Sequence, residues 1–377
     1  MTELFMFLKA QNLYIRIRTC QKKRIRKTEL VTMPAITTLH TYDTVYCADS
    51  VAWCPHDYYE HLFACGTYQL SEGESLTSTS GQSTRKGRIL LFDFDLDQNL
   101  LICKQKIETS AVLDQKWHSS IPSMAVANSN GEISMYKFST ENLLTPEDTL
   151  KISSEEEGEI LALSLDWTSQ GDKLAVSDSK GGISIISVEE SSLRQVHRWV
   201  AHTFEAWICA FDKNNQNILY TGGDDSLLCV YDMRCLQFTI AKMKNKSHRA
   251  GVTSILSFSQ QENLLATGSY DDNLRIFDIR SMKSSVSETN LQGGVWRLKS
   301  HPIQPSQILC ACMYHNFSVV TLNEDHSISV DAEYNEHGSI CYGCDWSYKK
   351  SERSAKYFAS CSFYDHKMCL AVLKGEK

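Results

Sequence analysis

AHTFEAWICAFDKNNQNILYTGGDDSLLCVYDMR (residues 201–234) aligns without a gap with SHRAGVTSILSFSQQENLLATGSYDDNLRIFDIR (residues 247–280), at an offset of 46 residues. Both stretches share a His near the start, then N-x-L, T-G, an Asp, and an aromatic-Asp pair followed by Arg. Each alternates short β-rich apolar runs with turns rich in Gly, Asn and Asp, as an antiparallel β-meander requires. The chain therefore contains a structural repeat.

Weaker copies of this unit flank the pair, at about 48–95, 112–138, 161–188, 293–322 and 340–373. The offset is close to the ~40–45 residues of a WD-type propeller blade, and the copies bring the total to seven. We therefore predict an all-β fold, a seven-bladed WD-repeat β-propeller that forms a single domain over residues 33–377.

The last unit ends almost at the C-terminus and lacks room for a fourth strand, whereas residues 35–46 (AITTLHTYDTVY) are β-rich and have no unit of their own. We expect this N-terminal segment to supply the outer strand of the last blade and close the ring. Closure leaves no gap between blades and covers their hydrophobic faces.

Composition is that of a soluble globular protein, with 42% hydrophobic and 22% charged residues among 377. No apolar run approaches the ~20 residues needed to cross a bilayer. The 14 cysteines are scattered and no cleavable signal peptide is evident, which favours reduced thiols and a cytoplasmic location.

The net charge of −7 is unevenly distributed. Residues 1–32 carry eight Lys or Arg against two Glu, a net charge of +6, so residues 33–377 carry −13. An acidic body is a poor binder of phosphate backbones, so we expect no direct nucleic-acid partner. The basic head is interpreted as a poorly ordered N-terminal extension, with Met33 a possible second start; a nucleic-acid arm and a transit peptide are the alternatives.

Several polar residues of the strong pair are explained by the fold. In WD-type blades the early His, the turn Asp and a strand residue form a buried hydrogen-bond network. His202 with Asp225, and His248 with Asp271, occupy those positions, so we assign them structural roles.

Common catalytic and metal motifs are missing from the sequence: it has no G-x-S-x-G, no Walker loop and no H-E-x-x-H. CYGC (341–344) has C-x-x-C spacing, but without a second such pair at zinc-site spacing core cysteines are the better interpretation. We expect neither a metal nor a cofactor.

Three aromatic residues are not required by the repeat. Trp207 lies opposite Thr253, near the point where the inner strand of the blade begins. The equivalents in the other blades are Asp49, Leu113, Leu163, Trp296 and Tyr342. Trp207, Trp296 and Tyr342 either plug the channel and pack between blades, or form a cluster of aromatic faces at its mouth.

Polar groups near the same end are also in excess. Glu205 stands where the neighbouring blade has Gly251, and SCSFYDH (360–366) places Tyr364, Asp365 and His366 in a turn. One of Tyr364 and Asp365 replaces the turn Asp of the other blades, which leaves at least one surplus polar group.

A set of motifs, taken in their order along the chain, resembles the eukaryotic WD-repeat diphthine methyl ester hydrolases. The motifs are ADSVAWCP, ACGTYQL, LSLDW, AHTFEAWI, YTGGDDSLL, GGVWRLKSHP, CACM, YGCDWS and SCSFYDH. The resemblance covers residues 40–373. It implies removal of a methyl ester from a modified histidine on translation elongation factor 2, which prepares the carboxylate for the final amidation of diphthamide biosynthesis. The basic head departs from the family, as does CMYHNF, where the His is expected one place earlier.

The implied substrate carries a trimethylammonium group beside the ester, and aromatic faces attract quaternary ammonium ions. Trp207, Trp296 and Tyr342 are therefore assigned to a cation-binding wall, with Glu205 adding charge. Candidate bases for a water attack are Glu205 and the Asp365/His366 pair, with Tyr364 or a backbone N–H as oxyanion donor. A covalent Ser362 or Cys361 is the rival mechanism, and a non-catalytic scaffold is the alternative function. We expect a monomer without a membrane partner.

Overall fold

The computed structural model describes residues 36–71, 84–152, 158–190, 192–259, 263–349 and 355–375. Within these ranges the chain forms 28 strands and no helix, and the strands make seven four-stranded sheets. The prediction of an all-β, seven-bladed propeller is confirmed. None of the described elements is a helix of the length and apolarity needed to span a membrane. The predicted N-terminal extension, residues 1–32, lies outside the described ranges.

Blades 1 to 3 each run along the chain from the innermost to the outermost strand. Blade 1 contains β2 (Cys47–Trp53), β3 (Leu62–Ser71), β4 (Thr84–Asp95) and β5 (Leu100–Ser110). Blade 2 contains β6 (Val112–Trp117), β7 (Ser123–Asn128), β8 (Glu132–Phe138) and β9 (Leu144–Lys151). Blade 3 contains β10 (Ala162–Trp167), β11 (Lys173–Asp178), β12 (Gly182–Glu189) and β13 (Ser192–Val200).

Blades 4 to 6 repeat this order. Blade 4 contains β14 (Ala206–Phe211), β15 (Ile218–Gly223), β16 (Leu228–Asp232) and β17 (Met243–Asn245). Blade 5 contains β18 (Val252–Ser257), β19 (Leu264–Ser269), β20 (Asn273–Asp278) and β21 (Ser287–Asn290). Blade 6 contains β22 (Val295–Ser300), β23 (Gln307–Cys312), β24 (Asn316–Leu322) and β25 (Ile328–Tyr334).

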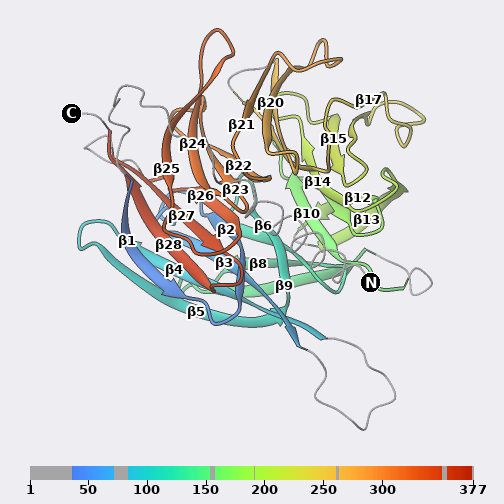
Figure 1. Ribbon diagram of the computed structural model, residues 1–377. Coiled ribbons are helices and arrows are strands. Elements are labelled where there is room, and N and C mark those ends of the chain that lie inside the picture. Colours follow the sequence, from blue (N-terminus) through green and yellow to red (C-terminus); the bar gives the residue numbers. More distant parts are fainter. Residues whose placement is uncertain are drawn as a thin grey trace, which may run out of the picture. The chain divides into compact units, whose positions relative to one another are not determined.

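Blade 7 joins the two ends of the described chain. It contains β26 (Cys341–Trp346), β27 (Lys356–Ser362) and β28 (Lys367–Leu373), and its outermost strand is β1 (Ile36–Asp43), antiparallel to β28. Figure 1 shows β1, in dark blue, beside the red strands β27 and β28. The predicted closure of the ring by an N-terminal strand is confirmed.

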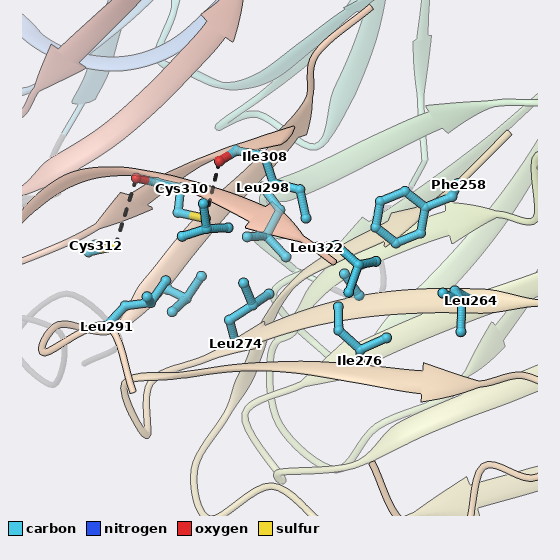
Figure 2. Close-up of a cluster of buried hydrophobic side chains, with 13 residues drawn as sticks. Phe258, Leu264, Leu274, Ile276, Leu291, Leu298, Ile308, Cys310, Cys312 and Leu322 are labelled. Carbon is cyan, nitrogen blue, oxygen red and sulfur yellow. Dashed lines mark hydrogen bonds between the residues drawn. The ribbon is translucent and has the colours of Figure 1, made fainter. Parts of the chain in front are cut away.

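The hydrophobic core lies between blades. Seven hydrophobic clusters of the described residues each join one blade to the next around the ring, and an eighth lies among the innermost strands. Figure 2 shows the cluster between blades 5 and 6, where Phe258 and Leu274 face Leu298 and Cys310. These side chains are at most 5% exposed, and burial of this kind is the main free-energy gain of folding. Every blade therefore depends on both neighbours.

Candidate functional site at the bulged end of the axis

Each innermost strand carries a β-bulge near its first residue. The skipped residues are Asp49, Leu113, Leu163, Trp207, Thr253, Trp296 and the pair Tyr342–Gly343. These are the seven positions that the repeat register made equivalent. A bulge redirects the side chain of the extra residue, and bulges are enriched beside functional sites. Because the strands are antiparallel, the bulges lie at the end of the propeller where the second and third strands of each blade are joined. We call it the bulged end.

An aromatic cluster lies on the axis at the bulged end. It belongs to a hydrophobic group contributed by six blades, which only an axial position allows. The ring centroids of Trp207 and Trp296 are 5.6 Å apart, and Trp296 stacks on Tyr342 at 4.9 Å. Tyr270 lies 5.9 Å from Trp296, and Phe363 lies 5.1 Å from Tyr342. We call these five residues the axial aromatic cluster.

The three aromatic residues singled out from the sequence are thus in one connected cluster. Trp207 is 6% exposed and Trp296 is 9% exposed, while Tyr270 and Tyr342 are half-buried. The tryptophan rings therefore pack mostly on one another, and the tyrosines offer the accessible surface. Sequence reasoning missed Tyr270 and Phe363 because they lie in turns between the second and third strands, whereas the comparison of blades followed the first strand.

Two acidic residues border the cluster. Trp207 Nε1 donates to Asp224 Oδ1 at 3.2 Å, and the Asp224 amide donates to the Glu205 carbonyl at 2.8 Å. Burial raises the pKa of Tyr270 well above its ordinary value, and the carboxylates of Asp224 and Glu205 raise it further. Asp224 is aligned with Tyr270 at the 46-residue offset, so the same comparison applied to the turn would have found it. The aromatic cluster is therefore bordered by two acidic residues on the side of blade 4.

The three residues of the turn 364–366 have different surroundings in the structure. Tyr364 is 54% exposed and lies edge-on to Phe363 with centroids 5.0 Å apart, so it adjoins the axial aromatic cluster. The Asp365 carboxylate accepts hydrogen bonds from Ser362 Oγ at 2.5 Å and from the Gly338 amide at 2.9 Å. Asp365, rather than Tyr364, takes the place of the turn Asp in blade 7.

His366 lies at the far side of this turn, next to β1. Its carbonyl accepts hydrogen bonds from the amide and the hydroxyl of Thr44, at 2.9 and 3.0 Å. The backbone of His366 has a positive φ of 53°, as residues that close tight turns often do. The structure therefore separates His366 from Glu205, which borders blade 4.

The two candidate nucleophiles of the alternative covalent mechanism, Ser362 and Cys361, are buried. Ser362 is 0% exposed, and its hydroxyl is shared between Asp365 and His337 Nδ1, which lies 2.6 Å away. Cys361 belongs to the core between blades 7 and 1, and burial raises the pKa of its thiol well above the ordinary value. Neither side chain has the accessibility that a nucleophile needs. Cys341 and Cys344 of the C-x-x-C sequence are likewise core residues between blades 6 and 7.

The predicted structural histidines differ from each other. His202 Nδ1 is hydrogen-bonded to Asp225 at 2.9 Å and Nε2 to Thr221 at 2.8 Å, which is the arrangement assigned from the sequence. His248 Nε2 is hydrogen-bonded to Thr267 at 2.9 Å, but its Nδ1 has no partner among the described residues.

Asp271 is not bonded to His248, so that expectation is corrected. Its carboxylate is instead paired with Arg275 at 2.8 Å and accepts the Arg249 amide at 2.8 Å. The reason is the burial of Arg275, which is 1% exposed and requires a carboxylate partner more strongly than a neutral imidazole does.

Comparison with known proteins agrees with this architecture. The family model described as "WD domain, G-beta repeat" matches residues 193–232 and 240–278. A chain in a crystal structure of the mitotic checkpoint complex superimposes with a TM-score of 0.69 over 94% of this chain and 98% of its own, at 16% identity, which establishes the fold alone. The fold and repeats thus define a WD-repeat propeller.

Two relatives define the family more closely. "Diphthine methyltransferase" of Mus musculus is 36% identical over 334 residues, covering 82% of this chain and 69% of that protein. "Diphthine methyltransferase homolog" of Dictyostelium discoideum is 34% identical over 362 residues, covering 87% of this chain and 96% of that protein. The chain belongs to the diphthine methyltransferase family, and the resemblance stated from its motifs is confirmed.

Proposed function

We propose that this protein acts in diphthamide biosynthesis by hydrolysing the methyl ester of diphthine methyl ester on translation elongation factor 2. The product, diphthine, carries the free carboxylate that the final amidation requires. Membership of the diphthine methyltransferase family supports the pathway. The observation that carries the proposal is the axial aromatic cluster with Glu205 and Asp224 beside it.

This arrangement suits the substrate side chain. A quaternary ammonium ion is attracted by aromatic faces, by about 0.5–2 kcal/mol for each well-placed ring, and cannot donate a hydrogen bond. It therefore needs rings and nearby negative charge rather than a pocket of acceptors. Tyr270 and Tyr342 supply accessible rings, and Glu205 and Asp224 supply the charge.

The surroundings also suit a protein as substrate. Phe204, in the same loop as Glu205, is 60% exposed, and Tyr364 is 54% exposed. Both lie at the bulged end, on opposite sides of the axial aromatic cluster. Exposed aromatic side chains are typical of protein-binding surfaces.

The relatives' names refer to methyl transfer, and the proposed reaction is removal of a methyl group, so the direction of the mass change is the decisive measurement. Purified protein is incubated with the methyl-esterified elongation factor, and the modified peptide is analysed by mass spectrometry. We expect the mass of one methylene group to be lost and methanol to be released. A gain of mass with a methyl donor present would instead favour transfer, and no change with tight binding would favour a scaffold.

Two variants distinguish the blade 4 side of the bulged end from the turn of residues 364–366. Glu205→Gln removes one of the two charges without changing the size of the side chain, so we expect a several-fold rise in KM with a smaller effect on kcat. His366→Ala alters a residue that the structure places beside β1, so we expect KM and kcat to stay near those of the wild type. The reverse ranking would move the site to the 364–366 turn.

A further inference from the structure

One side chain crosses the axis at the level of the axial aromatic cluster. Arg297, from β22 of blade 6, donates from Nη2 to the Leu113 carbonyl of blade 2 at 3.3 Å, and Nη2 lies 3.5 Å from Asp114 Oδ1. Blades 6 and 2 are separated in the ring by blades 7 and 1. The guanidinium carbon also lies 5.6 Å from the centroid of Trp296. Arg297 therefore places a positive charge on the axis, against the aromatic rings.

A carboxylate without a hydrogen-bond partner lies beside this charge. Asp49, the bulged residue of β2, is 5% exposed, and among the described residues its carboxylate has no hydrogen bond and no close ion pair. Burial raises the pKa of Asp49 to about 8, while Arg297 lowers it and Asp114 raises it. Asp49 is therefore close enough to both residues to respond to their charges.

The other buried aspartates of the innermost strands are fully engaged. Asp114, Asp166 and Asp345 each accept a backbone amide of the next blade, at 3.1, 2.8 and 2.8 Å, and each faces an Arg or Lys. These three link neighbouring blades. Asp49 makes no such link among the described residues, and a mostly buried carboxylate without protein hydrogen bonds contributes little to folding. Its presence is therefore not explained by the stability of the propeller.

Asp49 adjoins the aromatic cluster through blade 7. Burial raises the pKa of Tyr342 well above its ordinary value, and the charge of Asp49 contributes to this shift. Tyr342 in turn stacks on Trp296, which contacts Arg297. A titratable acid, a fixed cation and a stack of rings thus lie near enough to one another at the bulged end to interact electrostatically.

We propose that Asp49 is the general base of the ester hydrolysis and that Arg297 stabilises the oxyanion. The inference rests on the proposed function and names the catalytic groups of that site. It replaces Glu205 as the base and leaves Glu205 as a source of charge for the ammonium ion.

The reaction balances with water as the only co-reactant. Ionised Asp49 removes a proton from water as the water oxygen bonds to the ester carbonyl carbon, and the carbonyl electrons move onto oxygen. Among the described residues, only the Nη2 atom of the Arg297 guanidinium makes a hydrogen bond or an ion pair. The N–H donors on Nη1 and Nε are therefore available to the oxyanion. The carbon–oxygen bond to the methoxy group then breaks, and the proton on Asp49 passes to the departing oxygen as methanol forms.

The position of Asp49 predicts the pH dependence of the reaction. A base acts only when ionised, so kcat/KM should rise with pH and level off above the pKa of Asp49, about 8. The titratable or charged groups that interact with Asp49 come from four other strands and from its own: Arg297, Asp114, Tyr342, Cys361 and Cys47. Of these, Arg297 carries the positive charge that keeps the pKa from rising further.

The test compares wild type with Asp49→Asn, Asp49→Glu and Arg297→Met by methanol release from the methyl-esterified elongation factor between pH 6 and pH 9. We expect Asp49→Asn to lose at least about 100-fold in kcat, the lower range for removal of a general base, and to lose the rise with pH. Asp49→Glu should retain a rise with a shifted midpoint. Arg297→Met should move the midpoint to higher pH, because the charge that lowers the pKa is gone.

Two controls separate a chemical role from a structural one. Asp272→Asn changes another carboxyl group whose pKa burial raises, in the turn between β19 and β20, and should leave the pH profile unchanged. Asp49→Asn should bind the methylated factor as wild type does and should melt no lower than wild type, because it removes an unpaired buried carboxylate. A lower melting temperature, or lost binding, would assign Asp49 to folding or recognition and overturn the inference.

The outcomes also distinguish the two proposals. If wild type releases no methanol, the proposed function fails. If wild type is active and Asp49→Asn keeps its kcat and its pH profile, the function stands and the assignment of Asp49 fails. If only the Arg297→Met midpoint is unchanged, the assignment of Arg297 fails.

Discussion

Trp207 shows how packing orders the rings of the proposed binding site. Its indole N–H is held by Asp224, and its ring meets Trp296 and Tyr270 at 65° and 87°. Such edge-to-face contacts fix the orientation of the rings, and they leave part of the tyrosine surface accessible. The sequence alternatives of a plug and an aromatic wall are therefore not exclusive, because a rigid cluster also presents ordered faces.

Replacement of a ring tests this role at the residue scale. Tyr342→Leu and Tyr270→Leu should raise KM for the methyl-esterified factor about tenfold, since each removes an accessible ring and its cation–π contact, worth about 0.5–2 kcal/mol. Steady-state kinetics at fixed pH provides the measurement. Trp199→Leu is the matched control, because Trp199 is 8% exposed but lies in the outermost strand of blade 3, so it should lower stability with KM unchanged. Equal KM values for all three variants and wild type would remove the cluster from binding.

At the scale of the element, the two best repeats differ in how a blade is held together. In blade 4 a chain of hydrogen bonds joins His202, Thr221 and Asp225, whereas in blade 5 Asp271 is paired with Arg275 and His248 keeps one hydrogen bond. Equivalent positions of the repeat thus form two different hydrogen-bond networks. The difference comes from the residue of the third strand that pairs with the Thr of the second strand, which is Cys229 in blade 4 and Arg275 in blade 5.

Because the two networks differ, substitution of the histidine should lower the free energy of unfolding by different amounts in blades 4 and 5. His202→Ala leaves the Thr221 hydroxyl without a partner among the described residues. It also removes one of the three hydrogen bonds to the Asp225 carboxylate, which still accepts the Thr203 and Leu227 amides. We therefore expect a loss of about 2–3 kcal/mol in the free energy of unfolding. His248→Ala breaks one bond, and the loss should be about 1 kcal/mol smaller. Urea denaturation of both variants measures the difference; an equal or reversed order would show that the ion pair of blade 5 depends on His248.

His248 also predicts a dependence of stability on pH. Burial lowers its pKa from 6.5 to about 4, with Arg275 contributing. The unfolded chain therefore binds a proton at this residue between about pH 6.5 and pH 4 while the folded protein does not, so stability falls as the pH is lowered through that range. The loss between pH 7 and pH 5 should be about 2 kcal/mol for this residue.

His248→Gln should remove that part of the acid sensitivity, which urea midpoints at pH 7 and pH 5 will measure. His301 and His337, whose pKa values burial also lowers to about 4, should keep the remaining sensitivity in the variant. An unchanged difference between the two pH values would contradict the assignment.

For the molecule as a whole, the ring is closed by chain segments from opposite ends. Residues from Ile36 to Asp43 pair with β28, and Thr38 Oγ1 is hydrogen-bonded to Tyr334 of blade 6 at 2.7 Å. Because each hydrophobic cluster between blades joins two of them, loss of one strand exposes part of two interfaces.

Truncation tests ring closure. A chain beginning at Thr44 lacks β1 and should unfold at a markedly lower temperature, with a broader transition, than a chain beginning at Pro34, which keeps it. Differential scanning calorimetry on the two proteins is the measurement. Equal melting temperatures would mean that three strands suffice to hold blade 7 in the ring.

The sequence predicted the site only in part, for a geometric reason. Register along the repeat located Trp207, Trp296 and Tyr342, because every blade places the bulged residue at the same point. It did not indicate the function of Asp49, which was noted only as one of the equivalents, because a lone Asp in an apolar strand has no distinguishing pattern. Whether Asp49 has a hydrogen-bond partner depends on residues of other blades, which are distant from it in the sequence.

By itself the sequence determined the number of blades, the closing strand and the family, since these depend on local repetition and on motifs read in order. Only the tertiary structure decided which residues meet on the axis, because a closed ring brings blades 6 and 2 together although Arg297 and Leu113 are 184 residues apart in the chain. It also decided that Asp365 belongs to the fold and that Asp49 is left without a structural partner. Repetition along the chain specifies each blade, whereas the chemistry at the axis depends on how the blades differ at their shared centre.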